Sequence, residues 1–217
     1  MDTRGSVIVL GVDLAGSPRR PTGICVLDSE LTARTIVAYS DEEILESVRE
    51  NNPNVVAIDA PLSIPLGRKN IEDREGPHLR ECDKQLISLG IRFFPVTLGP
   101  MRRLTTRGMR LNDLLCSMGF MVIEVYPGGA QDMLGIPRKS RGLKALREGL
   151  EKLGIKGLYP SMSGDELDAV TAAYVGLLYL RDEALVLRGA DGAIVMPQVQ
   201  AHKVRYRAEN EVRRNFR

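Results

Sequence analysis

Two aspartates close the two most apolar segments near the start of the chain. Asp13 follows a β-branched run at residues 7–12, and Asp59 follows a similar run at residues 55–58. Both runs are typical of strands that are buried on two faces. If these strands are parallel neighbours, the two carboxylates meet at one edge of a sheet, where open α/β sheets place their ligands. An aspartate at a strand end can also form a turn or a cap, so neither residue alone defines a site.

A second set of carboxylates opens the helix that we expect at residues 165–181. Ser163 and Glu166 have the S-x-x-E spacing of a capping box, so Glu166 is expected to bond the backbone at the start of this helix. Asp165 suits the positive end of the helix dipole. Asp168 lies among apolar residues, where a carboxylate is disfavoured unless it has a partner. Asp165 and Asp168 share a helix face, and we expect both to point at the sheet edge.

Glu124 is a further acid, and it lies inside an apolar strand expected at residues 121–126. It is either a structural acid with its own partner or a member of the same carboxylate cluster. We therefore include Glu124 among the candidate catalytic residues.

Converging carboxylates of this kind suit hard divalent cations, Mg²⁺ or Mn²⁺, which prefer oxygen ligands. Two histidines and three widely spaced cysteines nearly exclude a His/Cys metal site. Without a cation the carboxylates would repel one another, and some would keep their protons. Such a site suits two-metal phosphoryl transfer. A glycosidase pair fits less well, because the chain has no tryptophan and only six tyrosines and four phenylalanines to bind a sugar.

The elements that must position these residues mix strands and helices. Strands are expected at residues 7–12, 22–27, 35–38, 55–59, 121–126 and 193–196, and helices at 41–50, 77–89, 104–118, 143–153 and 165–181. Three early strands that can pair as a meander, followed by crossover helices, predict an α/β fold with a mixed sheet flanked by helices. We expect one domain over residues 1–200, with an arginine-rich insertion at about 62–110, and a basic tail at 201–217.

The composition excludes several classes of protein. The 217 residues carry a net charge of +2 and 43% of them are apolar, which argues against disorder. No apolar run approaches the length of about 18 residues that a membrane span requires. The first apolar run is too short for a signal peptide, so we expect a cytoplasmic protein with reduced thiols. The last sixteen residues contain six cations and two acids, which leaves a mildly acidic body.

Six short motifs resemble the family called domain of unknown function 429. They are GVDLAG at residues 11–16, IDAPL at 58–62, RECD at 80–83, FP at 94–95, EVYP at 124–127 and DELDA at 165–169, in this order within residues 6–197. That family is predicted to be an RNase H-like nuclease. The resemblance therefore implies an RNase H-like core whose five strands have the order 3-2-1-4-5.

The resemblance also implies roles for four carboxylates. Their placement is similar to that in RuvC-type resolvases, which implies that Asp13, Asp59, Asp165 and Asp168 bind two ions of Mg²⁺ or Mn²⁺. The acid that ends the fourth strand is a glutamate in that group and an aspartate here. A shorter side chain at this point changes the distance to the metal.

Arginine outnumbers lysine by 23 to 7, and several basic residues lie in stretches without acids. The planar fork of arginine can hold two phosphate oxygens, so we expect these side chains to contact nucleic acid. A solvated surface or a surface ion pair is the alternative for each of them. The candidates are Arg80, Arg102, Arg103, Arg107, Lys139 and Arg141.

These features together predict a metal-dependent nuclease, a hydrolase that cleaves the phosphodiester bonds of nucleic acid. One alternative is a phosphotransferase of the actin and sugar-kinase type, because residues 11–16 also resemble its first phosphate loop. Another is a nucleic-acid-binding protein without catalysis. No membrane partner is expected, and a homodimer is left open.

Overall fold

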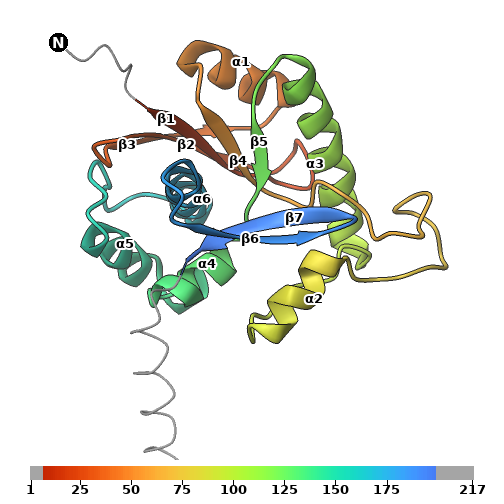
Figure 1. Ribbon diagram of the computed structural model, residues 1–217. Coiled ribbons are helices and arrows are strands. Elements are labelled where there is room, and N and C mark those ends of the chain that lie inside the picture. Colours follow the sequence, from red (N-terminus) through yellow and green to blue (C-terminus); the bar gives the residue numbers. More distant parts are fainter. Residues whose placement is uncertain (1–6, 199–217) are drawn as a thin grey trace, which may run out of the picture.

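A computed structural model describes residues 7–198 and places five strands in one mixed sheet (Figure 1). They are β1 (Ile8–Asp13), β2 (Thr22–Asp28), β3 (Ala33–Ala38), β4 (Val55–Asp59) and β5 (Val122–Glu124). Their order is β3-β2-β1-β4-β5; β2 is antiparallel to β1 and β3, and β4 is parallel to β1 and β5. The expected α/β class and RNase H-like fold are confirmed. The predicted tail at 201–217 lies outside the described residues.

Helices cover both faces of this sheet (Figure 1). One face carries α4 (Pro127–Leu134), α5 (Leu143–Lys152) and α6 (Gly164–Leu180), and the other carries α1 (Asp41–Asn51) and α3 (Gly99–Ser117). Side chains alternate along a strand, so Val9 packs into the core beneath α6, whereas Leu10 and Val12 pack beneath α1 and α3. Whether a residue has an odd or an even position in the strand therefore determines which helices its side chain can contact.

Helix α6 lies unusually close to β1 and β2 because both strands present glycine to it. A Cβ atom on Gly11 would collide with the backbone of Ala169, and one on Gly23 would collide with the backbone of Asp165. On the helix itself, a Cβ on Gly176 would lie 2.7 Å from Val9 Cγ1. Gly11 belongs to the segment that resembles a phosphate loop, but helix packing explains this glycine without a bound phosphate.

The remaining elements differ in part from the prediction. The short helices α2 (Glu81–Ser88) and η1 (Lys139–Arg141) connect the larger elements, and β6 (Ala184–Gly189) pairs with β7 (Gly192–Pro197) as a separate two-stranded sheet. Neither α4 nor β6 was expected, and α3 begins at Gly99 rather than at residue 104. Proline in the first turn of α3 and of α4 favours these helix starts. Within residues 7–198, no helix is long and apolar enough to cross a membrane.

The arginine-rich segment is irregular before α2, and one of its own arginines holds it together. The Arg68 side chain is 8% exposed and donates to the backbone oxygens of Pro77 (2.5 Å), Asp73 (2.6 Å) and Gly76 (3.1 Å). This arginine satisfies the carbonyl groups of a loop that has no strand or helix to do so.

Candidate active site

Asp13 and Asp59 lie side by side at the ends of β1 and β4. The two strands are parallel, and these two residues are direct partners in their register. Asp13 has the same parity as Val9 and Gly11, and Asp59 has the same parity as Ala57, so both carboxylates lie on the face that α6 covers. The expectation that the two strands are parallel neighbours is confirmed.

Helix α6 brings two more carboxylates to this point. Asp168 is only 5% exposed, and its Oδ1 accepts a hydrogen bond of 2.7 Å from Nε2 of Gln131 on α4. Asp165 lies one turn earlier and is more exposed. Ser163 and Glu166 form the predicted capping box, with hydrogen bonds of 3.2 and 2.8 Å, so Glu166 is used to fix the start of α6.

Lys139 inserts its ammonium group among these carboxylates. Its Nζ lies 2.8 Å from Oδ2 of Asp168, 3.4 Å from Oδ2 of Asp13 and 3.4 Å from Oδ1 of Asp165. The side chain runs past Gly164, where an added Cβ would lie 3.1 Å from the Lys139 Cδ atom. The sequence predicted Lys139 as a contact for nucleic acid, but here its charge faces the carboxylates.

The pKa values of this cluster are shifted mainly by burial, and the neighbouring charges add to or oppose that effect. Burial raises the pKa of Asp13 to about 7, and the charges of Asp168 and Asp165 also raise it while Lys139 opposes the shift. Burial raises the pKa of Asp59 well above its ordinary range, and the charges of Asp13 and Asp168 add to the shift. Burial disfavours the charged form of Lys139, but Asp13 and Asp168 outweigh it and raise its pKa.

Asp59 has no partner comparable to those of Asp168. Within residues 7–198, no side chain or backbone group donates a hydrogen bond to its carboxylate, although this group is only partly exposed. A half-buried carboxylate without a protein donor must rely on water, a proton or a cation to offset its charge. Asp59 is therefore the member of the cluster whose surroundings call most clearly for a further ligand.

The donor chemistry of the cluster fits Mg²⁺ or Mn²⁺, because its side chains offer only oxygen. The positions of the carboxylates in this structure, however, do not form a site for a metal ion. Over the described part of the chain, no group of three or more His, Cys, Asp or Glu side chains is arranged to hold a metal ion. The Lys139 ammonium instead lies between three of the carboxylates.

Glu124 lies outside this cluster, on the other face of the sheet. It is the register partner of Ile58, whose side chain packs beneath α1 and α3. Its carboxylate receives hydrogen bonds of 2.7 and 2.6 Å from Nη1 and Nη2 of Arg80 and one of 2.8 Å from the backbone of Leu62. This placement differs from the prediction of a catalytic Glu124 and matches the structural alternative.

Arg80 also differs from its prediction as a nucleic-acid contact. It is 1% exposed, and all five of its N–H groups donate to protein oxygens. Asp83 accepts two of these bonds, Glu124 accepts two and Ser63 accepts one. No donor is left to bind a phosphate group.

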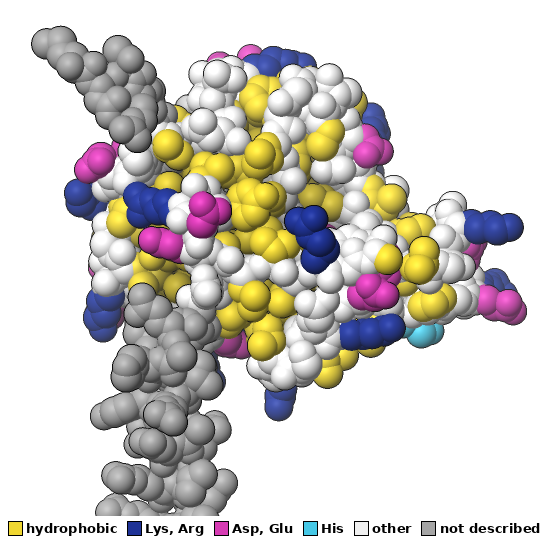
Figure 2. Space-filling model, in the orientation of Figure 1, with side chains coloured by type: hydrophobic (Ala, Val, Ile, Leu, Met, Phe, Trp, Pro, Cys, Tyr) yellow, Lys and Arg dark blue, Asp and Glu magenta, His cyan; other side chains and the backbone are white. Residues whose placement is uncertain are grey.

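The other predicted cations divide into buried and exposed residues. Arg107 is 8% exposed and bonds to Asp41 (2.7 Å) and to the backbone oxygen of Ala15 (2.6 Å), so it fixes the loop after β1 rather than reaching solvent. Arg102 is partly exposed and donates to the backbone oxygen of Thr97. Arg103 and Arg141 are exposed. On the face shown in Figure 2, Lys and Arg form scattered groups rather than one continuous basic surface.

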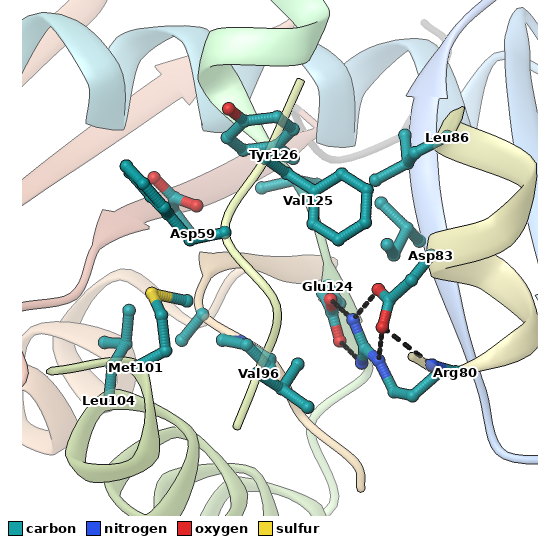
Figure 3. A pocket seen from close by; sticks show the side chains of 15 residues that line it. Asp59, Arg80, Asp83, Leu86, Val96, Met101, Leu104, Glu124, Val125 and Tyr126 are labelled. Atoms are coloured by element: carbon teal, nitrogen blue, oxygen red, sulfur yellow. Dashed lines mark hydrogen bonds and ion pairs between the residues drawn. The ribbon is translucent and has the colours of Figure 1, made fainter. Parts of the chain in front are cut away.

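A cavity of about 180 Å³ adjoins the cluster at Asp59. Figure 3 shows Asp59 on one side of it and the Arg80, Asp83 and Glu124 network on the opposite side, with Tyr126 above. The remaining walls are mostly apolar and come from α2, α3, β7 and the segment between α2 and α3. Sequence reasoning missed this cavity, because its walls come from segments that are far apart in the chain.

Replacing Glu124 with alanine is expected to destabilise the fold by about 3 kcal/mol, because it removes one of the two buried carboxylates that pair with Arg80 and leaves two N–H groups of this arginine without an acceptor. Glu72→Ala is the matched control, since the Glu72 carboxylate is 62% exposed and lies 3.5 Å from Arg102; its expected cost is below about 0.5 kcal/mol. Unfolding in urea measures both. Full stability of Glu124→Ala would contradict the structural role.

Asp13→Asn is expected to stabilise the metal-free protein by roughly 2 kcal/mol at alkaline pH and to have little effect at acidic pH. The raised pKa of about 7 means that the folded protein binds this proton more tightly than the unfolded chain. The wild type therefore loses stability as the pH rises from the ordinary value of 3.8 through about 7, whereas asparagine stays neutral. Thermal unfolding in EDTA across this range provides the measurement, and a difference that does not change with pH would oppose it.

Comparisons with known proteins do not assign this chain to a family. The chain matches no protein-family model, so membership of the domain of unknown function 429 family stays a prediction. A stretch of 132 residues is 33% identical to porphobilinogen deaminase of Corynebacterium glutamicum (strain R) and covers 57% of this chain. The match spans only 42% of the length of that curated protein.

Two solved structures are similar in shape. Against the T. thermophilus RuvC in complex with Holliday junction substrate, the TM-score is 0.48 with 14% identity, over 86% of this chain and 99% of that one. Against the Thermus thermophilus RuvC structure, the TM-score is 0.42 with 16% identity, over 81% and 97% of the two chains.

Proposed function

We propose that this protein is a metal-dependent nuclease that hydrolyses phosphodiester bonds in nucleic acid. The observation that carries the proposal is the meeting of Asp13 and Asp59, from neighbouring parallel strands, with Asp165 and Asp168 of α6 around one ammonium group. A purely structural cluster would balance its acids with bases. Among residues 7–198, Lys139 is the one cation that pairs with these acids, and it contacts three of the four, which leaves a formal charge of −3 when all four are ionised.

The four aspartates would hold two divalent cations, Mg²⁺ or Mn²⁺. When bound, such cations would supply Lewis-acid polarisation of a phosphodiester and activation of water near neutral pH. Since Lys139 contacts three of these carboxylates, its ammonium would have to move away for the cations to bind. The charge of two divalent cations would then balance four ionised carboxylates, and the charge of one would not.

The protein's own residues hold the cluster ready for this role. Gln131 fixes one oxygen of Asp168 and leaves the other facing Lys139. The capping box at Ser163 sets where α6 begins and hence where Asp165 lies. Arg107 anchors the loop that follows Asp13 through the backbone oxygen of Ala15. The exposed Arg103 and Arg141 are left to bind substrate phosphates.

Asp13→Asn and Asp168→Asn are each expected to reduce Mn²⁺-dependent cleavage of DNA or RNA by at least about two orders of magnitude, because each removes a charged cation ligand. Both changes keep the size of the side chain, so the circular dichroism spectrum should not change. Asp113→Asn, in an exposed position on α3, is the control and should cleave like the wild type. Equal cleavage by all four proteins would exclude this mechanism.

Lys139→Met is expected to bind Mn²⁺ about tenfold more tightly than the wild type, because the cation no longer has to displace an ammonium group. Titration calorimetry measures the affinity without any substrate. Lys144→Met is the matched control, since Lys144 is 82% exposed and its nearest acid is Glu148, outside the cluster. An unchanged or weaker affinity in Lys139→Met would show that Lys139 does not compete with the cation.

A further inference from the structure

The cavity beside Asp59 belongs to no step of the mechanism above. We propose that it receives one nucleobase of the bound nucleic acid strand, an inference that rests on the proposed nuclease function. The cavity and the carboxylate cluster share Asp59. A base inside the cavity would therefore leave its sugar and phosphate near the cluster.

The size and walls of the cavity suit a flat ring. Its volume is about 180 Å³, and cavities of about 150 Å³ in protein cores bind benzene. Phe93, Phe94 and Tyr126 supply aromatic surface, and Val96, Met101 and Leu104 supply aliphatic surface (Figure 3). Bases that leave a stack are commonly held against aromatic side chains.

The polar groups of the cavity exclude an anion. Arg80 has donated all five of its N–H groups to other side chains, so it offers nothing to a phosphate or carboxylate ligand. With Asp83 and Glu124 it forms a unit of formal charge −1. The hydroxyl of Tyr126 donates to the backbone oxygen of Arg92 (2.8 Å) and accepts from Arg138 (3.1 Å).

The group left for a ligand is the carboxyl group of Asp59, whose oxygens can accept hydrogen bonds. The ligand must therefore bring apolar faces and N–H donors at its edge. A nucleobase has both, in its ring and its amino groups. A free phosphate has no apolar face to pack against these walls.

The rim of the cavity indicates how a strand would enter. Phe94 is 68% exposed although it is a large aromatic residue, and it also lines a wider groove together with Arg92 and Arg138. The groove thus offers the exposed Arg92 to the backbone on one side of Phe94, whereas Arg138 is paired with Asp132, and the cavity offers an apolar space on the other side. Exposed aromatic residues beside arginines are typical of surfaces that bind single strands.

The test measures binding of a single-stranded oligonucleotide series in which each member lacks one base. Binding in EDTA prevents cleavage. In the wild type, loss of the base at one position should weaken binding about tenfold, and loss at the other positions should matter less. Phe94→Ala should weaken binding of the intact strand by a similar factor but should not weaken binding of that one abasic strand further.

Two variants make this result specific. Leu66→Ala is the matched control, because Leu66 is 67% exposed but does not line the cavity, and it should bind like the wild type. Met101→Trp fills the cavity and should have the same effect as Phe94→Ala. Equal effects of every abasic position, or an equal loss for intact and abasic strands in Phe94→Ala, would overturn the proposal.

A cleavage assay with Mn²⁺ on the same strands separates the two proposals. If the wild type cleaves strands regardless of which base is missing, the cavity proposal fails and the nuclease stands. If the wild type cleaves none of them, including the intact strand, the nuclease itself fails.

Discussion

Helix α6 can lie against β1 and β2 only because Gly11 and Gly23 present no side chain to it. This close contact decides where the acids of the helix are found. Asp165 and Asp168 come to the end of β1, next to a residue that the parallel register with β4 has already paired with Asp59. Backbone packing thus brings four acids together. The contacts of Lys139 and part of the rise in the pKa values of Asp13 and Asp59 are consequences of that crowding.

Two groups of charged side chains lie at this edge of the sheet, and they differ in how completely their carboxylates are paired. On one face, a single arginine satisfies Asp83 and Glu124 with bonds of 2.6 to 3.2 Å. On the other face, one lysine serves several aspartates through contacts of 2.8 to 3.4 Å, and Asp59 receives no hydrogen bond from the described residues. The first group is complete and stabilises the fold. The second is incomplete, which is the state expected of a site that awaits a ligand.

Local sequence patterns predict the elements whose formation depends on neighbouring residues in the chain. Apolar runs that end in aspartate predicted β1, β4 and the meeting of Asp13 with Asp59. Glu124 was ambiguous, because the face it takes depends on pairing with β4, and a single strand does not reveal its register. Pro127 reads as the end of a strand, although it also suits the first turn of α4. The burial of Arg80 could not be foreseen, because only Asp83 lies near it in sequence and the other two partners, Glu124 and Ser63, come from distant parts of the chain.

Asp59 touches two environments at once, the carboxylate cluster on one side and the apolar cavity on the other. Its charge state cannot be set by one of them alone. If the proposed sites are occupied, a ligand that approaches Asp59 from the cavity would alter how strongly the cluster attracts a cation, and by thermodynamic reciprocity the cation would change the ligand's affinity for the cavity by the same factor. A single shared carboxylate thus makes the two spaces energetically dependent on each other without any movement of the backbone.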